Sequence, residues 1–412
     1  MQPEGGLAAA AGLTAVGAAV AALLRSRAAL AAGVAAGLGL AGLVALASGR
    51  PDLDLGLGSA AGSLPWVRVL IAATGAELVL IVILAPPGAG RLNLLGPGLA
   101  GISGLVVISV VPDLFLAGVA IIALAAGHSA LPGLRSFPSR MRGPVLGVAL
   151  LALGSLLLHS QQGGATPRLG ALFLALGIAA AAGLTPFQQL FEPAEPAASS
   201  SLAWSAFLAP AMVPALVGRA EALLSPSTAV IFSAVLIGIG LLNLLAGLIG
   251  AWTAEEDALA WRHSFLADWG LALVGMGILL ADGSGAAFLI LLAMVLVRLP
   301  LYLFSRPVLR GMTPRRMSVL NLLLAGLLAG LAPFGSFAAR LLLLRGSVHL
   351  YWPLAAVLAL ALVLWLPHAF RLAGTLGRPA GRAAVGVAIA VVASLALGIA
   401  PAPWLHAGGF QP

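Results

Sequence analysis

A succession of apolar segments, each about 17 to 25 residues long, limits the fold of this chain more than any other feature. The segments follow one another along nearly all of the 412 residues and lack the apolar–polar alternation of membrane β-strands. Because lipid offers the peptide group no hydrogen-bond partner, a segment that crosses a bilayer must be a helix or belong to a closed barrel. The segments therefore predict an all-α integral membrane protein, with the lipid bilayer as its main solvent.

Composition and charge narrow the functional classes. Of the residues, 61% are hydrophobic and 8% are charged, which is too little polar surface for a water-soluble globule of this size. The net charge of +8 comes from arginines in short loops, where they orient a membrane protein, so we expect no nucleic-acid partner. The chain has no cysteine, which excludes disulfides, thiolate metal sites and iron–sulfur ligation. We expect no cofactor and no metal in this chain.

About fourteen transmembrane helices are predicted, in a single polytopic membrane domain over residues 1–412. Loops of only a few residues leave no room for an inserted soluble domain. Glu4 and no basic stretch precede the first segment, so we expect no cleavable signal peptide. The helices are expected near residues 7–24, 28–48, 69–86, 94–112, 114–131, 144–159, 169–185, 202–217, 228–252, 265–281, 285–304, 318–339, 346–366 and 383–400.

The distribution of arginine predicts the orientation, because short cytoplasmic loops are enriched in basic residues. One of the 21 arginines, Arg298, lies within an apolar segment, and fourteen lie in odd-numbered loops. The other six lie in even-numbered loops and are Arg50, Arg68, Arg168, Arg219, Arg340 and Arg345. Odd-numbered loops are thus expected in the cytoplasm and both termini outside it, in a protein of the cell (inner) membrane.

Prolines within apolar segments indicate broken helices, most clearly Pro300 in VRLPLYLF and Pro333 in LAPFGSFAAR. Proline removes a backbone donor, and a membrane tolerates the freed carbonyl where it faces protein or a water-filled cavity. Ion transporters use broken helices of this kind at their binding sites. The alternative for both prolines is an ordinary kink.

Ionisable residues inside apolar segments are the candidates for function, because a charge at the bilayer centre costs at least about 2.5 kcal/mol. Arg298 lies well inside its segment, although its side chain is long enough to reach the cytoplasmic face. Glu77 lies in the middle of RVLIAATGAELVLIVILAP, too far from Arg68 for a pair on one helix. It requires a partner from another helix, or it stays neutral and makes a packing hydrogen bond.

Three more residues are candidates, each with a structural alternative. Asp268 lies near the start of a predicted segment, where it is either interfacial or part of an ion pathway. His128 is a candidate proton relay because the histidine pKa is near neutral, or it is a structural histidine. Arg340 follows the PFGSF break, at the mouth of a cavity or as an ordinary positive flank. The sequence contains no nucleotide-binding loop, metal-ligand cluster or nucleophilic triad.

One stretch resembles a family signature, that of the antiporter-like subunits of respiratory complex I, membrane-bound hydrogenases and Mrp sodium/proton antiporters. The family pattern PFHxWLPxAxxxAPTPVSA is similar to LGIAAAAGLTPFQQLFEPAEPAASSSLAWSAFLAP at residues 176–210. Pro186 and Phe187 match, the next residue is Gln188 where the family has histidine, and the Pro-rich loop is kept. The resemblance implies a helix broken at Pro186.

Four other stretches resemble family motifs in the expected order. EEDALAWRHSFLADWGLALVGMGIL has Asp268 where the family has histidine. FLILLAMVLVRLPLYLF and LLLAGLLAGLAPFGSFAARLLLLRG place Arg298 and Arg340 at family lysines, and SRMRGPVLGVALLALGSLLL places Arg142 near another. The resemblance implies that these residues belong to an ion pathway.

The resemblance covers residues 110–345 and implies a subunit of a hetero-oligomeric complex that translocates protons or sodium ions in the respiratory chain. We expect no covalent chemistry in this chain itself, although the whole assembly would be an NADH-quinone oxidoreductase-type translocase. Ala120, Ala181 and Ala211 stand where the family has charged residues. These alanines leave two alternatives open: a non-conducting structural paralogue within such a complex, or an independent secondary transporter.

Overall fold

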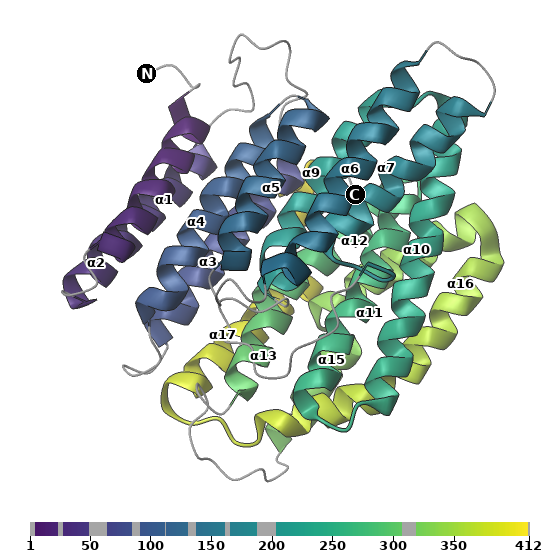
Figure 1. Cartoon of the computed structure of the whole chain (residues 1–412). Helices are drawn as coiled ribbons and strands as arrows, with labels where there is room; N and C mark the ends of the chain where they lie inside the picture. The colour runs from purple at the N-terminus through teal and green to yellow at the C-terminus, as the bar shows by residue number, and fades with distance from the viewer. Residues whose placement is uncertain are drawn as a thin grey trace. The chain divides into compact units, whose positions relative to one another are not determined.

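The computed structural model describes residues 5–23, 28–48, 64–84, 91–111, 113–130, 137–160, 165–187, 203–306 and 319–410. Within these ranges nearly every residue is helical and none is in a β-strand (Figure 1), which confirms the all-α fold. The helices are α1 (Gly5–Leu23), α2 (Ala28–Ser48), α3 (Pro65–Leu84), α4 (Arg91–Val110), α5 (Leu114–Ala130), α6 (Phe137–His159), α7 (Thr166–Ala182), η3 (Trp204–Leu208), α9 (Ala209–Leu223), α10 (Pro226–Thr253), α11 (Asp257–Gly277), α12 (Ala281–Ala293), η4 (Met294–Arg298), α13 (Leu299–Ser305), α15 (Val319–Ala329), α16 (Gly335–Leu376), α17 (Gly381–Ile399) and α18 (Pro401–Ala407).

The chain divides into two compact units. Unit 1 contains Met1–Ile83 and Gly90–Phe232, and unit 2 contains Ser233–Pro412 with the short segment Leu84–Ala89. The boundary falls inside α10, so the single membrane domain expected over residues 1–412 consists of two units.

The lengths of the helices agree with a multi-pass membrane protein. Among the described residues, seven helical runs are long and apolar enough to cross a bilayer: Pro65–Leu84, Phe137–His159, Trp204–Leu223, Pro226–Thr253, Ala281–Ser305, Trp352–Leu376 and Gly381–Ile399. Further apolar helices of 10–17 residues include those within α1, α2, α4, α5, α7 and α15. The count of fourteen spans and the placement of the termini stay predictions.

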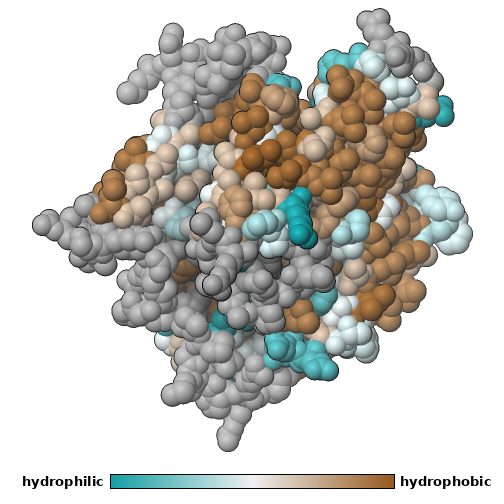
Figure 2. All heavy atoms as spheres, in the orientation of Figure 1, coloured by the Kyte–Doolittle hydropathy of each residue, from teal (hydrophilic) through white to brown (hydrophobic). Residues whose placement is uncertain are grey.

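Large apolar side chains cover the outer surface of several helices. Leu156, Ile249, Trp352 and Val363 each expose more than half of their surface. In Figure 2 hydrophobic residues form broad areas of the visible surface, and hydrophilic residues form only small groups. Such a surface is unfavourable in water, so these areas are the ones that lipid or other membrane subunits cover.

Several predicted helix boundaries differ from the structure, most clearly around Pro333 and Tyr351. The predicted helix 318–339 is interrupted, because α15 ends at Ala329 and α16 begins at Gly335. The chain then remains helical to Leu376, apart from a kink at Tyr351, whose φ of −165° and ψ of 104° are not helical. The next span therefore begins after the kink, at Trp352, and not at residue 346.

In unit 1, a close backbone approach joins α6 to α7, and an arginine joins α9 to the end of α4. A Cβ atom on Gly147 of α6 would collide with the backbone of Ala181 in α7, so only glycine permits this approach. Arg219 of α9 donates hydrogen bonds to the carbonyl oxygens of Ile108 and Val111 at the end of α4, at 2.7 Å each. A positive side chain is well suited to this position, because the last carbonyls of a helix lack helical partners.

In unit 2, the run α12–η4–α13 is almost completely buried, with 94% of its span inside the protein. Helices α10 and α11 also pack with their backbones close together, because a Cβ atom on Gly270 would meet the Gly240 carbonyl oxygen at 2.7 Å. The most buried span of unit 2 is therefore the one that carries Arg298.

Both π-helical segments, η3 and η4, end two residues before a proline. The Ala209 N–H donates to the Trp204 carbonyl, and the Leu299 N–H donates to the Met294 carbonyl, with Pro210 and Pro300 next in the chain. Proline cannot donate a hydrogen bond and its ring crowds the preceding turn, so a wider turn relieves the clash. The chain stays helical through Pro300 to Ser305. The break predicted at Pro300 is therefore absent, and a π-helical turn precedes this proline instead.

Candidate functional site

A six-residue pattern, AGL(T/A)PF, ends one helix in each unit with the same backbone conformation. It covers residues 182–187 after α7 and residues 329–334 after α15. Gly183 and Gly330 have φ values of 71° and 66°, and a cis peptide bond precedes each proline. After each glycine, the leucine N–H bonds to the carbonyl five residues earlier, which is the usual C-terminal cap of a helix. The helices therefore end just before Pro186 and Pro333.

At the break in unit 1, the contacts seen in the described part of the chain involve Trp204 and Gly147, which are uncharged. The Trp204 indole N–H donates to the Ala181 carbonyl at 2.9 Å. Ala181 is fully buried against Gly147, which leaves no space for a long side chain at this position. The family lysine is therefore absent at Ala181, and the structure has no space there for a lysine side chain.

The break in unit 2 is surrounded by charged side chains. Arg340 of α16 donates to the Ala329 carbonyl, the last residue of α15. The carbonyl of the preceding residue, Leu328, accepts a hydrogen bond from the indole of Trp365 at 3.1 Å and a long one from Arg298 at 3.4 Å. These two carbonyls are among those that a helix leaves without helical partners.

Arg298 and Asp268 form a buried ion pair. The Arg298 guanidinium donates to the Asp268 carboxylate and, at 3.1 Å, to the Ser264 carbonyl of the same helix. The guanidinium carbon also lies 5.2 Å from the centre of the Trp365 ring, within cation–π range. Arg298 and Asp268 expose 4% and 8% of their surface, so both charges are shielded from solvent.

Arg340 adds a second cation to this pair. It exposes 8% of its surface and interacts electrostatically with both Asp268 and Arg298. The site therefore brings two guanidinium groups and one carboxylate together from α11, η4 and α16. Buried charges are expensive in a membrane and are kept where a function requires them. The structure thus joins three sequence-predicted residues into one site, which we call the central charge site.

Glu77 belongs to unit 1, whereas the central charge site belongs to unit 2. It exposes 2% of its surface within α3, and its Oε1 atom has no hydrogen-bond partner among the described residues. Of the two alternatives for Glu77, an ionic partner from another helix is not seen in the described part of the chain. A neutral carboxylic acid fits such surroundings better than a carboxylate.

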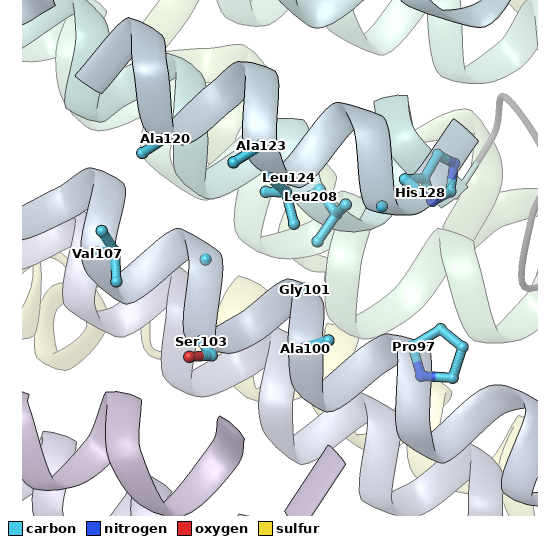
Figure 3. A pocket seen from close by; sticks show the side chains of 12 residues that line it. Pro97, Ala100, Gly101, Ser103, Val107, Ala120, Ala123, Leu124, His128 and Leu208 are labelled. Carbon is cyan, nitrogen blue, oxygen red and sulfur yellow. The ribbon is translucent and has the colours of Figure 1, made fainter. Parts of the chain in front are cut away.

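His128 lies at one end of a groove of about 400 Å³ between α4 and α5. In Figure 3, His128 and Pro97 lie at one end of the groove, and Ala120 and Val107 lie at the other. The imidazole is 5.7 Å from the Trp204 ring, in a tilted arrangement. Ala120, where the family has glutamate, thus lines a largely apolar groove.

Arg142 is an exposed residue of α6 in unit 1. The central charge site also includes a contact that the sequence did not predict. Trp365 contacts Arg298, although the sequence around Trp365 is an apolar run that indicates no such contact. A tryptophan within a span could have indicated a polar contact, because its indole N–H requires an acceptor when it is buried. Among the described residues, no group of three or more His, Cys, Asp or Glu side chains is placed to hold a metal ion.

Known structures share this arrangement of helices. One is a chain of the membrane-bound sulfane sulfur reductase, an archaeal respiratory membrane complex, with a TM-score of 0.76, 15% identity and coverage of 97% of this chain and 76% of that chain. A second is a chain of the Mrp complex from Dietzia sp. DQ12-45-1b, with a TM-score of 0.75, 18% identity and coverage of 99% and 52%. A third is a chain of respiratory complex I from Thermus thermophilus, with a TM-score of 0.73, 18% identity and coverage of 98% and 97%.

This chain has the fold of these membrane-complex chains. The fold that the sequence resemblance implied is therefore confirmed, and so is the multi-pass membrane character. No family model matches the sequence, and no curated protein matches it significantly. The chain spans about half of the Mrp complex chain and nearly all of the complex I chain.

Proposed function

We propose that this chain is a membrane subunit of a complex I-like or Mrp-like assembly and contributes to proton or cation translocation coupled to electron transport. The observation that supports this most strongly is the central charge site, built on a broken helix beside the most buried span of unit 2. Broken helices beside buried charges are the usual construction of ion sites in transporters.

Asp268 is the group of this site that exchanges the ion. Arginine stays protonated at any physiological pH, so Arg298 and Arg340 supply fixed positive charge but release no proton. The carboxylate of Asp268 can bind a proton, and its pairing with Arg298 controls when it does so. The Arg298 guanidinium donates to Asp268 and to the Leu328 carbonyl at the same time, so the ion pair is tied directly to the end of the broken helix α15.

The partners in this proposal are other membrane subunits, and the location is the cell (inner) membrane. The outward apolar side chains of α6, α10 and α16 provide surface that such subunits or lipid cover. Protons and sodium ions are both compatible with a single carboxylate. The electron-transfer chemistry then belongs to the partner subunits.

A second candidate, a structural subunit that does not conduct, is favoured by unit 1. Its helix break contains Ala181 and Trp204 in place of charged side chains, and Ala120 lines an apolar groove. In that case the central charge site holds α11, η4 and α16 together, and the chain supports conducting neighbours.

Ion flux in proteoliposomes, followed by internal pH under an imposed membrane potential, distinguishes the two candidates. The variant Asp268→Asn is compared with Asp268→Glu, which keeps the carboxylate, and with Asp282→Asn, which alters an aspartate paired with the exposed Arg345. We expect Asp268→Asn to lower the flux at least about tenfold, Asp268→Glu to retain most of it, and Asp282→Asn to stay within about twofold. Size-exclusion chromatography checks the folding of each variant.

Wild-type flux that persists in folded Asp268→Asn would contradict a role for this carboxylate. No flux from the wild type, either alone or within its complex, would favour the structural subunit. Flux of the isolated chain without any partner would favour an independent transporter.

A further inference from the structure

His368, in the last three turns of α16, is a buried titratable residue that the proposed function leaves unused. It exposes 5% of its surface, and its Nε2 atom has no hydrogen-bond partner among the described residues. A buried polar atom without a partner is costly in a folded protein and more so in a membrane. Its position therefore requires an explanation beyond packing.

Two tryptophan rings hold the imidazole of His368. The Trp252 ring of α10 lies 4.9 Å away in an edge-to-face arrangement, and the Trp365 ring lies 5.3 Å away, one turn earlier on α16. Trp365 also contacts Arg298 and bonds to the Leu328 carbonyl. His368 is thus separated from the central charge site by a single indole ring.

On its other side, His368 leads toward the surface of unit 2. Arg371, one turn later on α16, is the charged group that acts electrostatically on His368 within the described chain. Arg371 lies 3.6 Å from the carboxylate of Asp257 and donates to the carbonyls of Glu255 at 3.1 Å and Ala251 at 3.4 Å. Arg371 and Asp257 are both partly exposed. Trp365, His368 and Arg371 therefore follow one another at one-turn intervals along α16, from the central charge site toward the start of α11.

We propose that His368 is a proton-transfer residue that connects the central charge site with the surface formed by Arg371 and Asp257. The proposal rests on the proposed function and adds the side of unit 2 on which the proton enters or leaves. Trp365 cannot carry a proton, so water beside its ring completes the step between Asp268 and His368.

The transfer is balanced in protons and moves no electrons. The proton leaves the protonated carboxyl group of Asp268 through water and binds the lone pair of the neutral His368 imidazole, so the carboxylate and the imidazolium form together. The imidazolium then releases the proton to water or to the Asp257 carboxylate at the surface. Histidine suits this step because its unperturbed pKa is close to neutral.

The first test is proton flux in proteoliposomes with the variants His368→Gln and His349→Gln. His349 is exposed on the same helix, so it is the matched control. We expect His368→Gln to lower the flux at least about tenfold and to flatten its dependence on pH, as the loss of a general acid–base group does. Flux with the wild-type pH profile in His368→Gln, together with loss of flux in Asp268→Asn, would overturn the proposal and leave the proposed function intact.

The second test does not depend on conduction and uses tryptophan fluorescence during a pH titration of the purified protein. An imidazolium quenches an adjacent indole, so the wild type should show a fluorescence step on acidification that His368→Gln lacks. His128→Gln is the control, because it removes the imidazole near Trp204 and should leave the step in place. Identical titrations of the wild type and His368→Gln would overturn the proposal, even if the wild type does not conduct.

Discussion

At the scale of single residues, the main result is the pairing of Asp268 with Arg298. Both were candidates from the sequence, but Asp268 also had an interfacial alternative, because its helix was predicted to begin near residue 265. The helix in fact begins at Asp257, which places Asp268 in its middle. Hydropathy assigned Arg262 and its neighbours to a loop, although Arg262 is buried within α11. A hydropathy scale treats every arginine as exposed, so it cannot predict buried pairs.

The ion pair predicts a specific pattern of stability. Asp268→Asn leaves the Arg298 cation buried without its counter-ion, and we expect it to lower the free energy of unfolding by about 3 kcal/mol or more. The double variant Asp268→Asn with Arg298→Gln replaces both charges by neutral amides and should recover most of that loss. Thermal or chemical unfolding in detergent measures both values.

The exposed pair of Asp282 and Arg345 is the control for this prediction. Its guanidinium nitrogen and carboxylate oxygen lie 3.1 Å apart, but the arginine is largely exposed. Removing it should change the stability by no more than about 1 kcal/mol. If the single and double variants of the buried pair lose the same stability, the pair is not a coupled unit. The recovered double variant also separates folding from flux, because it should fold and not conduct.

At the scale of secondary-structure elements, two breaks with one backbone conformation have different surroundings. The sequence predicted a break at Pro186 from the family pattern and at Pro333 from the proline itself. Comparing the chain with itself would also have shown the repeated AGL(T/A)PF pattern. What the sequence could not supply is which side chains approach each break, since Trp204, Arg340 and Trp365 arrive from other helices or later turns.

Alanine substitutions of the two glycines test this difference. Each introduces a side chain at a positive φ, which costs about 1 kcal/mol in both variants. At Gly330 the new Cβ atom also collides with the Arg340 guanidinium, whereas at Gly183 it meets only a Trp204 ring carbon at 3.9 Å. We therefore expect Gly330→Ala to lower ion flux severalfold and Gly183→Ala to leave flux unchanged. Equal effects on flux would show that the two breaks contribute alike.

At the scale of the whole molecule, contacts within unit 2 place three helix ends on one side. Arg371, near the end of α16, contacts Asp257 at the start of α11. Asn321, at the start of α15, donates to the carbonyl of Gly377 just after α16, at 3.1 Å. The loops next to these ends are odd-numbered in the segmentation that the sequence predicts. The assignment of that side to the cytoplasm stays a prediction.

The opposite side of unit 2 is marked by the contact of Arg345 with Asp282. The sequence analysis assigned Arg345 and Arg340 to the same even-numbered loop, but both lie within α16 and Arg340 is buried. The break at Pro333 divides the predicted span 318–339 into two helices. The second helix, α16, therefore begins later and continues past both arginines. A break of a few residues is too short to appear in a hydropathy average.

The absence of cysteine allows a direct test of this topology in the intact chain. Single variants Glu256→Cys, Arg378→Cys and His349→Cys replace exposed residues of unit 2. A maleimide that does not cross membranes should label the first two only from the cytoplasmic side and His349→Cys only from the other side. Labelling of all three with the sides exchanged would keep the arrangement of unit 2 and reverse its orientation. Labelling of Glu256→Cys and Arg378→Cys from different sides would contradict the contacts that join α10, α11 and α16, and with them the exit that we propose for His368.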